Sequence, residues 1–349
     1  MSKLFDPIKI GAYTLPNRII MAPLTRSRAG SQRIPNDLMA TYYAQRSNAG
    51  LILTEATAVH PSGVGYANTP GIWSYEQIDG WKKITKAVHD EGGKIFMQLW
   101  HVGRISDPMF LNGELPVAPS AIPATGHVSL VRPEKSFVTP RALRTEEIPT
   151  IVEYFRSGAQ NALQAGFDGV EIHGANGYLL DQFLQDGTNT RTDHYGGSLE
   201  NRARLPLEIT DAVISVWGAD KVGYHIAPRS DAHGISDSNP LATFSYLAGE
   251  LGKRKIAFIF AREFQDHSSI GAQIKKAFGG VYIANEKFTR EAAELIIEKG
   301  DADAVAFGLS FIANPDLVNR FQKDAPLNQV NFATLYSEGE VGYTDYPAL

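Results

Sequence analysis

The sequence predicts a single (β/α)8 barrel (a TIM barrel, class α/β), and two observations point to this fold. Eight short apolar runs recur along the 349 residues, each followed by a helix-like or polar stretch. The runs are apolar at successive positions, which is typical of parallel strands buried on both faces. Such alternation over more than about 250 residues favours a closed barrel. A doubly wound sheet is the alternative, but no Gly-x-Gly-x-x-Gly motif follows the first run.

The predicted elements follow one another in a regular order. Strands are expected at residues 18–22, 50–54, 94–98, 169–172, 221–226, 255–260, 279–283 and 302–307. Amphipathic helices are expected between them, at residues 75–91, 148–165, 198–216, 241–252 and 289–299. A short extra helix is expected to begin at residues 314–316, which read Asn-Pro-Asp.

Two segments lie outside this repeat. Residues 5–17 are expected to form a hairpin that closes the floor of the barrel. Residues 104–145 form a long insertion after the third strand, rich in Pro and Gly. A loop longer than ~15 residues inside a compact domain is usually functional. We therefore expect one domain over residues 1–349, with the insertion as a cap over its catalytic face.

The composition excludes several classes of function. The hydrophobic content of 43% and the charged content of 20% are those of a globular protein with an extensive core. The net charge of −5, without a basic tract, argues against binding nucleic acid or an anionic membrane. The chain has no cysteine, which excludes disulfides and thiolate chemistry. No signal-peptide pattern, membrane-length apolar stretch or metal-ligand spacing of histidines is present, so a cytoplasmic enzyme without a metal is expected.

The turn after the fourth predicted strand carries the clearest chemical signal. Residues 171–178 read Glu-Ile-His-Gly-Ala-Asn-Gly-Tyr, so an imidazole, a carboxamide and a phenol occur within six positions. His173 and Asn176 can both donate hydrogen bonds to one oxygen, and Tyr178 can deliver a proton nearby. Two donors beside a proton source suit the reduction of a polarised double bond.

The carboxyl ends of the other strands add to this site, because function collects there in barrels of this class. The residues at these positions are Pro23, Thr25, Ala56, Gln98, Trp100, His225, Asn285 and Gly308. The small residues after the seventh and eighth strands lie where such barrels commonly bind phosphate through backbone N–H groups. The sequence therefore predicts a slot for a flat, phosphorylated cofactor.

Several motifs in order resemble one known family. They are residues 17–26, 98–104, 173–183, 191–202, 306–308, 312–316 and 342–347. The chain resembles the old yellow enzyme family of FMN-dependent ene-reductases, in its bacterial branch with N-ethylmaleimide and nitrate-ester reductases. The resemblance implies non-covalent FMN, with NADPH or NADH as hydride donor and an electron-poor alkene or nitro compound as substrate. Residues 191–202 are expected to build a loop and to cap the next helix. The resemblance leaves the oligomeric state open.

The resemblance implies a role for each site residue. His173 and Asn176 would hold the substrate's carbonyl or nitro oxygen, and Tyr178 would protonate the carbon alpha to it. Those that would contact the flavin are Pro23, Thr25, Ala56, Gln98, His225, Asn285 and Gly308. Those that would wall the substrate slot are Tyr66, Trp100 and Tyr336. Thr25 would donate to flavin O4, Gln98 would bond its pyrimidine edge, and Asn285 and Gly308 would cradle the phosphate through backbone amides.

Two positions depart from the family pattern. His225 stands where many members place an arginine against the flavin N1–O2 edge, and Leu309 where many have arginine at the phosphate. Histidine titrates near neutrality and leucine carries no charge. Weaker or pH-dependent stabilisation of the reduced flavin is therefore expected, with greater reliance on backbone amides at the phosphate.

Two other readings remain open at this point. One is another FMN barrel, such as a 2-hydroxy-acid oxidase or a dihydroorotate dehydrogenase. These enzymes normally need a basic proton acceptor, whereas the turn at residues 173–178 favours donation. The other is a flavin- or ligand-binding module without turnover, which would not need a positioned Tyr178.

Overall fold

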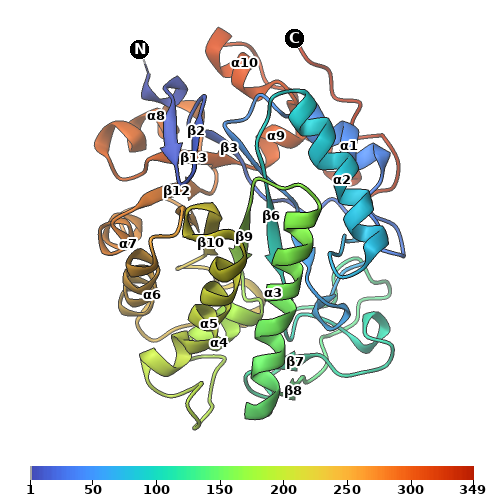
Figure 1. The fold of residues 1–349 in the computed structure, drawn as a ribbon, viewed down its shortest axis with the longest axis vertical. Helices are drawn as coiled ribbons and strands as arrows, with labels where there is room; N and C mark the ends of the chain where they lie inside the picture. The colour runs from blue at the N-terminus through green and yellow to red at the C-terminus, as the bar shows by residue number, and fades with distance from the viewer. Residues whose placement is uncertain (1) are drawn as a thin grey trace.

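The computed structural model describes residues 2–349 and forms a closed barrel of eight parallel strands surrounded by helices (Figure 1). Neighbouring strands pair in chain order, and the last strand pairs with the first. The barrel strands are β3 Ile19–Met21, β4 Leu51–Leu53, β6 Ile95–Trp100, β9 Gly169–His173, β10 Val222–Ile226, β11 Phe258–Arg262, β12 Val281–Asn285 and β13 Ala304–Phe307. The short strand β5, Thr57–Ala58, adds to β6. The predicted (β/α)8 barrel is confirmed.

Helices cover the outside of the barrel, and those predicted are present within one or two residues of the expected bounds. The helices are α1 Asp37–Ala44, α2 Tyr75–Asp90, α3 Ile148–Gln164, α4 Leu179–Leu184, α5 Leu199–Trp217, α6 Pro240–Arg254, α7 Gly271–Phe278, α8 Arg290–Lys299, α9 Leu309–Ala313 and α10 Leu317–Lys323. Helices α1, α4, α7 and α9 were not predicted. Among residues 2–349, no helix combines the length and the apolar character needed to cross a membrane.

The N-terminal hairpin closes the amino-terminal end of the barrel, as the sequence indicates. Strands β1 (Ile8–Ile10) and β2 (Tyr13–Leu15) pair antiparallel. Their apolar side chains join one cluster with Phe96 and Phe258 from the barrel strands. The Tyr13 hydroxyl also donates to the Asp168 carbonyl oxygen at 2.9 Å, at the start of β9. The opposite, carboxyl-terminal end of the barrel is therefore left for the site.

Alternation along the strands decides which side chains reach that end. Residues two apart point to the same side of a strand, so β6 directs Phe96, Gln98 and Trp100 into the barrel in succession. Phe96 belongs to the apolar cluster above the hairpin, and Trp100 to a separate cluster under the insertion. By the same rule, Glu171 and His173 on β9 point into the barrel, Glu171 beside Gln98 and His173 at the height of Trp100.

The insertion, residues 104–145, lies at the end of the molecule opposite the two termini, where β7 (Val117–Ala118) and β8 (Arg141–Ala142) pair (Figure 1). Its apolar residues Ala124, Val128 and Phe137 pack in one cluster with Trp100. The insertion therefore contacts the wall of the predicted substrate slot.

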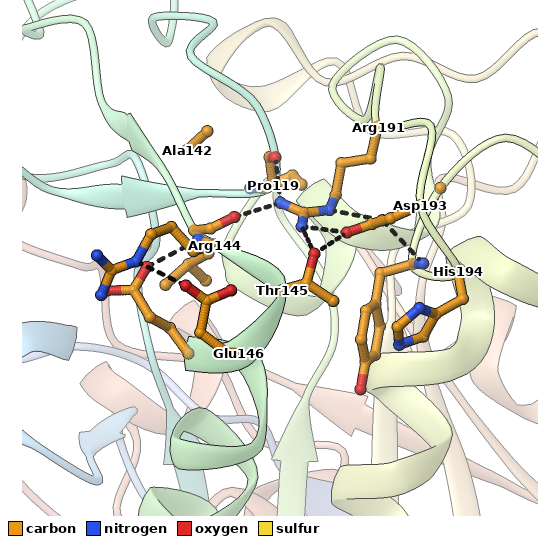
Figure 2. Close-up of polar contacts among 12 residues, drawn as sticks. Pro119, Ala142, Arg144, Thr145, Glu146, Arg191, Asp193 and His194 are labelled. Atoms are coloured by element: carbon orange, nitrogen blue, oxygen red, sulfur yellow. Dashed lines mark hydrogen bonds and ion pairs between the residues drawn. The ribbon is translucent and has the colours of Figure 1, made fainter.

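The loop at residues 190–198 fastens the middle and the carboxyl-terminal end of the insertion to the barrel. The Arg191 guanidinium donates to the Pro119 and Leu143 carbonyl oxygens, at 3.0 and 2.5 Å (Figure 2). Asp193 accepts from the Thr145 hydroxyl at 2.5 Å and from Arg191 at 3.0 Å. Ser198, at the end of this loop, caps α5. The expectation that residues 191–202 form a loop and a helix cap is confirmed.

Strands β11 and β12 lie two to three residues later than the sequence indicates. Lys255 adopts a left-handed conformation (φ 56°) and ends α6, so it cannot begin the sixth strand. Strand β11 consequently starts at Phe258 and continues to Arg262. This shift brings Arg262, which the sequence analysis did not select, to the carboxyl end of the barrel.

Candidate active site

A cavity of about 410 Å³ opens at the carboxyl ends of the barrel strands. It is lined by strands β10 and β11, by the segments that follow β3, β12 and β13, and by the turn after β9. The predicted residues that line it are Pro23, Asn176, His225, Asn285 and Gly308. The volume lies within the roughly 300–1,000 Å³ that small-molecule and cofactor sites occupy.

The turn after β9 has a conformation that only certain residues adopt. Asn176 has φ 57° and Gly177 has φ 78°, and asparagine and glycine are the residues that tolerate this left-handed region best. A Cβ on Gly174 would lie 2.3 Å from the Tyr224 hydroxyl, so only glycine fits there. The Gly177 N–H donates to the buried Asp181 carboxylate at 2.9 Å. Tyr224 and Asp181 thus hold the turn in place, and the turn presents Asn176 to the cavity.

Four rings form a continuous wall beside this turn. The Tyr66 ring stacks on Trp100 at 5.4 Å between centroids, and Trp100 stacks on His173 at 6.4 Å. Tyr178 packs edge-on against His173 at 5.0 Å and against Trp100 at 5.1 Å. The Tyr66 and Tyr178 hydroxyls share a hydrogen bond of 2.8 Å. The structure therefore brings together His173 and Tyr178 with two of the three predicted wall residues.

Burial keeps these groups neutral. It raises the pKa of Tyr178 well above its ordinary value, with further contributions from Tyr66, and it raises the pKa of Tyr66 to about 12. Burial also lowers the pKa of His173 to about 3, helped by the Arg262 charge. Near neutral pH, Tyr178 is a protonated phenol that can give up a proton, and His173 is a neutral imidazole that can donate one hydrogen bond.

Under the wall lies a buried polar group made by three adjacent strands. The Gln98 side-chain nitrogen Nε2 bonds Glu171 Oε2 at 2.6 Å and His225 Nδ1 at 3.0 Å. Burial raises the pKa of Glu171 to about 8 and lowers the pKa of His225 well below its ordinary value. The expectation that His225 titrates near neutrality is therefore wrong, because its desolvation disfavours the charged form.

Charged side chains lie beside Asn176 in the cavity. Arg262 donates to Asn176 Oδ1 at 3.1 Å and forms an ion pair with Glu286 at 2.5 Å. Lys287 lies with its ammonium 5.6 Å from the Phe264 ring centroid. Glu286 and Lys287 both have positive φ, 110° and 55°, which concentrates backbone strain in the loop after β12. Sequence analysis missed Arg262 because it ended the sixth strand at residue 260; continuing the inward alternation from Phe258 would have reached it.

Three other predicted residues do not line the cavity. Thr25 is half-buried and follows the lining residue Pro23, but it does not itself line the cavity. Ala56 packs in the cluster with Trp100. Tyr336 is 48% exposed and lies close enough to raise the pKa values of Tyr66 and Tyr178.

The segments that follow β12 and β13 have the arrangement of a phosphate-binding site in a barrel of this kind. The loops after β12 and β13 and the short helix α9 meet at the cavity, which is the arrangement that binds phosphate in many barrels. The Asn285 side chain donates to the Ala306 carbonyl oxygen at 2.8 Å and ties the ends of β12 and β13 together. Leu309 lines the same end and is 44% exposed. The side chain at this position, a leucine, offers no charge to a phosphate.

Three unpaired buried nitrogens at the carboxyl ends of the strands fit a flavin. Among residues 2–349, the buried nitrogens His173 Nδ1, His225 Nε2 and Trp100 Nε1 have no hydrogen-bond partner. Leaving a buried polar group unpaired costs about 1–3 kcal/mol, so such groups mark a place for a polar ligand. An isoalloxazine ring has carbonyl oxygens and ring nitrogens along one edge, and its phosphate would reach the loops after β12 and β13.

Comparisons with known proteins agree with this assignment. Residues 3–328 match the model of the NADH:flavin oxidoreductase / NADH oxidase family. The chain is 44% identical to 12-oxophytodienoate reductase 2 of Arabidopsis thaliana, with 99% of this chain and 96% of that protein covered. It is 42% identical to a probable flavin mononucleotide-dependent alkene reductase of Leishmania infantum, with 99% and 97% covered.

Solved structures give the same result. The old yellow enzyme homologue from Zymomonas mobilis superposes with a TM-score of 0.97 at 44% identity, covering 99% of this chain and all of that one. Morphinone reductase in complex with tetrahydroNAD superposes with a TM-score of 0.96 at 47% identity, covering 100% and 98%. The chain therefore belongs to the NADH:flavin oxidoreductase / NADH oxidase family, and it is an FMN-dependent ene-reductase of the old yellow enzyme type.

Proposed function

We propose that His173, Asn176 and Tyr178 are the catalytic residues, and that the substrates are enones, maleimides and nitroalkenes, with nitrate esters as a further class. NADPH or NADH is the hydride donor. The observation that carries this proposal is that one turn holds the neutral imidazole of His173 packed against the protonated phenol of Tyr178, beside the Asn176 amide that lines the cavity. We further propose that the enzyme acts in the cytoplasm.

FMN, when bound, would supply the redox chemistry, which is hydride transfer between the nicotinamide and the alkene. The residues of this chain that would hold it are Pro23, Thr25, Ala56, Gln98, His225, Asn285 and Gly308. The loops after β12 and β13 would bind the phosphate, and the Gln98–His225 pair would meet the pyrimidine edge.

The protein's own contribution to alkene reduction is orientation and charge stabilisation. His173 and Asn176 would donate hydrogen bonds to the substrate's carbonyl or nitro oxygen, which becomes more negative as the β carbon accepts hydride. Asn176 is suited to this because its Oδ1 accepts from Arg262, which leaves the amide N–H groups for the substrate. Tyr66, Trp100 and Tyr336 would wall the slot and exclude water.

Proton delivery falls to Tyr178. Its hydroxyl lies in a hydrogen bond with Tyr66, so the proton that it gives to the α carbon can be replaced through that second phenol. The high pKa of Tyr178 keeps the proton in place until the α carbon becomes basic. A neutral His173 cannot be the acid near neutral pH, because its pKa of about 3 leaves no proton to give from an imidazolium.

An anaerobic titration tests the proposal. The purified yellow protein should bleach on addition of NADPH or NADH and recover its colour on addition of 2-cyclohexenone. Bleaching by a 2-hydroxy acid would point instead to an oxidase, and a flavoprotein that no donor bleaches would point to a binding module. His173→Ala should bleach normally and recover roughly 10²–10³-fold more slowly, since one such donor is typically worth that factor.

A further inference from the structure

We propose that Glu171 is a positioning residue of the flavin site, which acts through Gln98 to keep the proton of His225 on Nε2, the nitrogen left for the cofactor. The inference rests on the proposed flavin site and goes beyond it, because Glu171 lies beneath that site. It also assigns the pH response of the cofactor to this carboxyl group rather than to His225.

Strand register explains why three side chains from three strands meet. Parallel pairing sets Gln98 of β6 beside Glu171 of β9, and His173 of β9 beside His225 of β10. The side chains at these levels point into the barrel, where they meet directly above the apolar layer. Glu171 Oε2 lies 2.6 Å from Gln98 Nε2 and 4.0 Å from His225 Nδ1.

In this orientation of the Gln98 amide, with the proton of Glu171 on the unpartnered Oε1, counting hydrogens gives the tautomer of His225. The Gln98 amide nitrogen carries two hydrogens, and it has two partners, Glu171 Oε2 and His225 Nδ1. A ring nitrogen that accepts a hydrogen bond carries no proton, so the proton of the neutral His225 lies on Nε2. That atom is buried and has no partner among residues 2–349, and His225 lines the cavity. Without the Glu171 oxygen, the Gln98 amide could turn over and reverse the tautomer.

The surroundings of Glu171 make it the group that titrates. Burial raises its pKa to about 8, and the Gln98 hydrogen bond opposes part of that rise. The group that faces it from β6 is the uncharged Gln98; from β10 it is His225, which burial holds neutral; and on its own strand His173 is neutral as well. The interior below is apolar. No neighbouring positive charge therefore compensates a carboxylate at this position, and it ionises only as the pH passes about 8.

Reduced flavin carries additional negative charge, so it disfavours ionisation of Glu171, and the ionised Glu171 disfavours reduction to the same extent. If reduction raises the pKa of Glu171 by about one unit, the ratio of FMN dissociation constants in the two redox states changes about tenfold across the titration. The flavin midpoint potential should therefore fall more steeply as the pH rises through about 8.

The test uses the FMN-loaded protein and two variants. Glu171→Gln retains an oxygen that can accept from Gln98 but cannot titrate, and Glu171→Leu loses both properties. Glu298→Gln, at an exposed position on α8, is the control. Midpoint potentials are measured from about pH 6 to about pH 10, and FMN dissociation constants are measured by flavin fluorescence.

The expected result separates orientation from titration. Glu171→Gln should bind FMN within about threefold of wild type and lose the steep section near pH 8, whereas Glu298→Gln should keep it. Glu171→Leu should weaken FMN binding about tenfold. A Glu171→Gln protein with the wild-type potential profile would overturn the inference and leave the proposed function intact. Holoprotein that is not reoxidised by an enone would contradict the proposed function instead. If Glu171→Leu does not fold, the Glu171→Gln profile alone decides.

Discussion

Replacement of Asn176 can separate the chemistry of its side chain from the conformation of its backbone. The residue lines the cavity with φ 57°, and its Oδ1 accepts from Arg262 at 3.1 Å. Asn176→Gly removes the amide donor and keeps the left-handed backbone, because glycine adopts it without strain. Asn176→Ala removes the same donor and keeps a Cβ, which in the left-handed region lies too close to the following carbonyl oxygen, without the local hydrogen bonding of an asparagine side chain.

The two variants should have the same kinetic defect and different stabilities. Loss of one donor to a developing oxyanion costs about 2.7–4 kcal/mol, so alkene reduction should slow roughly 10²–10³-fold in both. Asn176→Ala should also unfold more easily than Asn176→Gly, by about 1 kcal/mol, since a non-glycine residue in this region costs about 1–2 kcal/mol.

Rapid mixing of the reduced enzyme with 2-cyclohexenone measures the rate, and urea unfolding measures the free energy. Asn176→Asp is the matched control for shape, because it fills the same space without an N–H group. A rate for Asn176→Gly within about threefold of wild type would exclude the donor role. Equal unfolding free energies for the glycine and alanine variants would refute the backbone argument.

Three further changes have defined outcomes. Tyr66→Phe should slow protonation by Tyr178 about two- to tenfold, the value of one neutral hydrogen bond, and raise the solvent isotope effect on reoxidation. Glu286→Gln should free Arg262 and tighten FMN binding while leaving riboflavin binding unchanged; equal tightening of both would argue against a phosphate effect. Glu171 keeps its proton to about pH 8 when folded but releases it near pH 4.5 when unfolded, so stability should fall as pH rises through that range, and less so in Glu171→Gln.

Most of the barrel could be predicted because each strand is buried on both faces and therefore apolar at successive positions. The prediction failed where a local backbone feature decides a boundary. Lys255 adopts a left-handed conformation at the end of α6, and nothing in its residue type indicates this. Helices α1 and α7 have eight residues each, and such short helices give a weak periodic signal.

The site was predicted in part, because residues at strand ends can be recognised one strand at a time. Pro23, Asn176, His225, Asn285 and Gly308 were found in this way and line one cavity. Partners from neighbouring strands could not be found, since they depend on register and on strand length. Glu171 is an ordinary strand residue in the sequence, and only its pairing with Gln98 of β6 and the approach of the His225 side chain from β10 to 4.0 Å reveal its position.

The distribution of charge in this site suggests how the chain manages without an arginine at position 225. The groups nearest the expected pyrimidine edge are an amide and a neutral imidazole, with a carboxyl that stays protonated up to about pH 8. The cation Arg262, on the neighbouring strand β11, bonds Asn176 and is paired with Glu286, and its charge helps to lower the pKa of His225. A fixed cation would stabilise reduced flavin equally at all pH values. Neutral donors above a titratable acid stabilise reduced flavin less once that acid ionises. The flavin of this enzyme should therefore become a progressively weaker hydride acceptor as the pH rises above about 8.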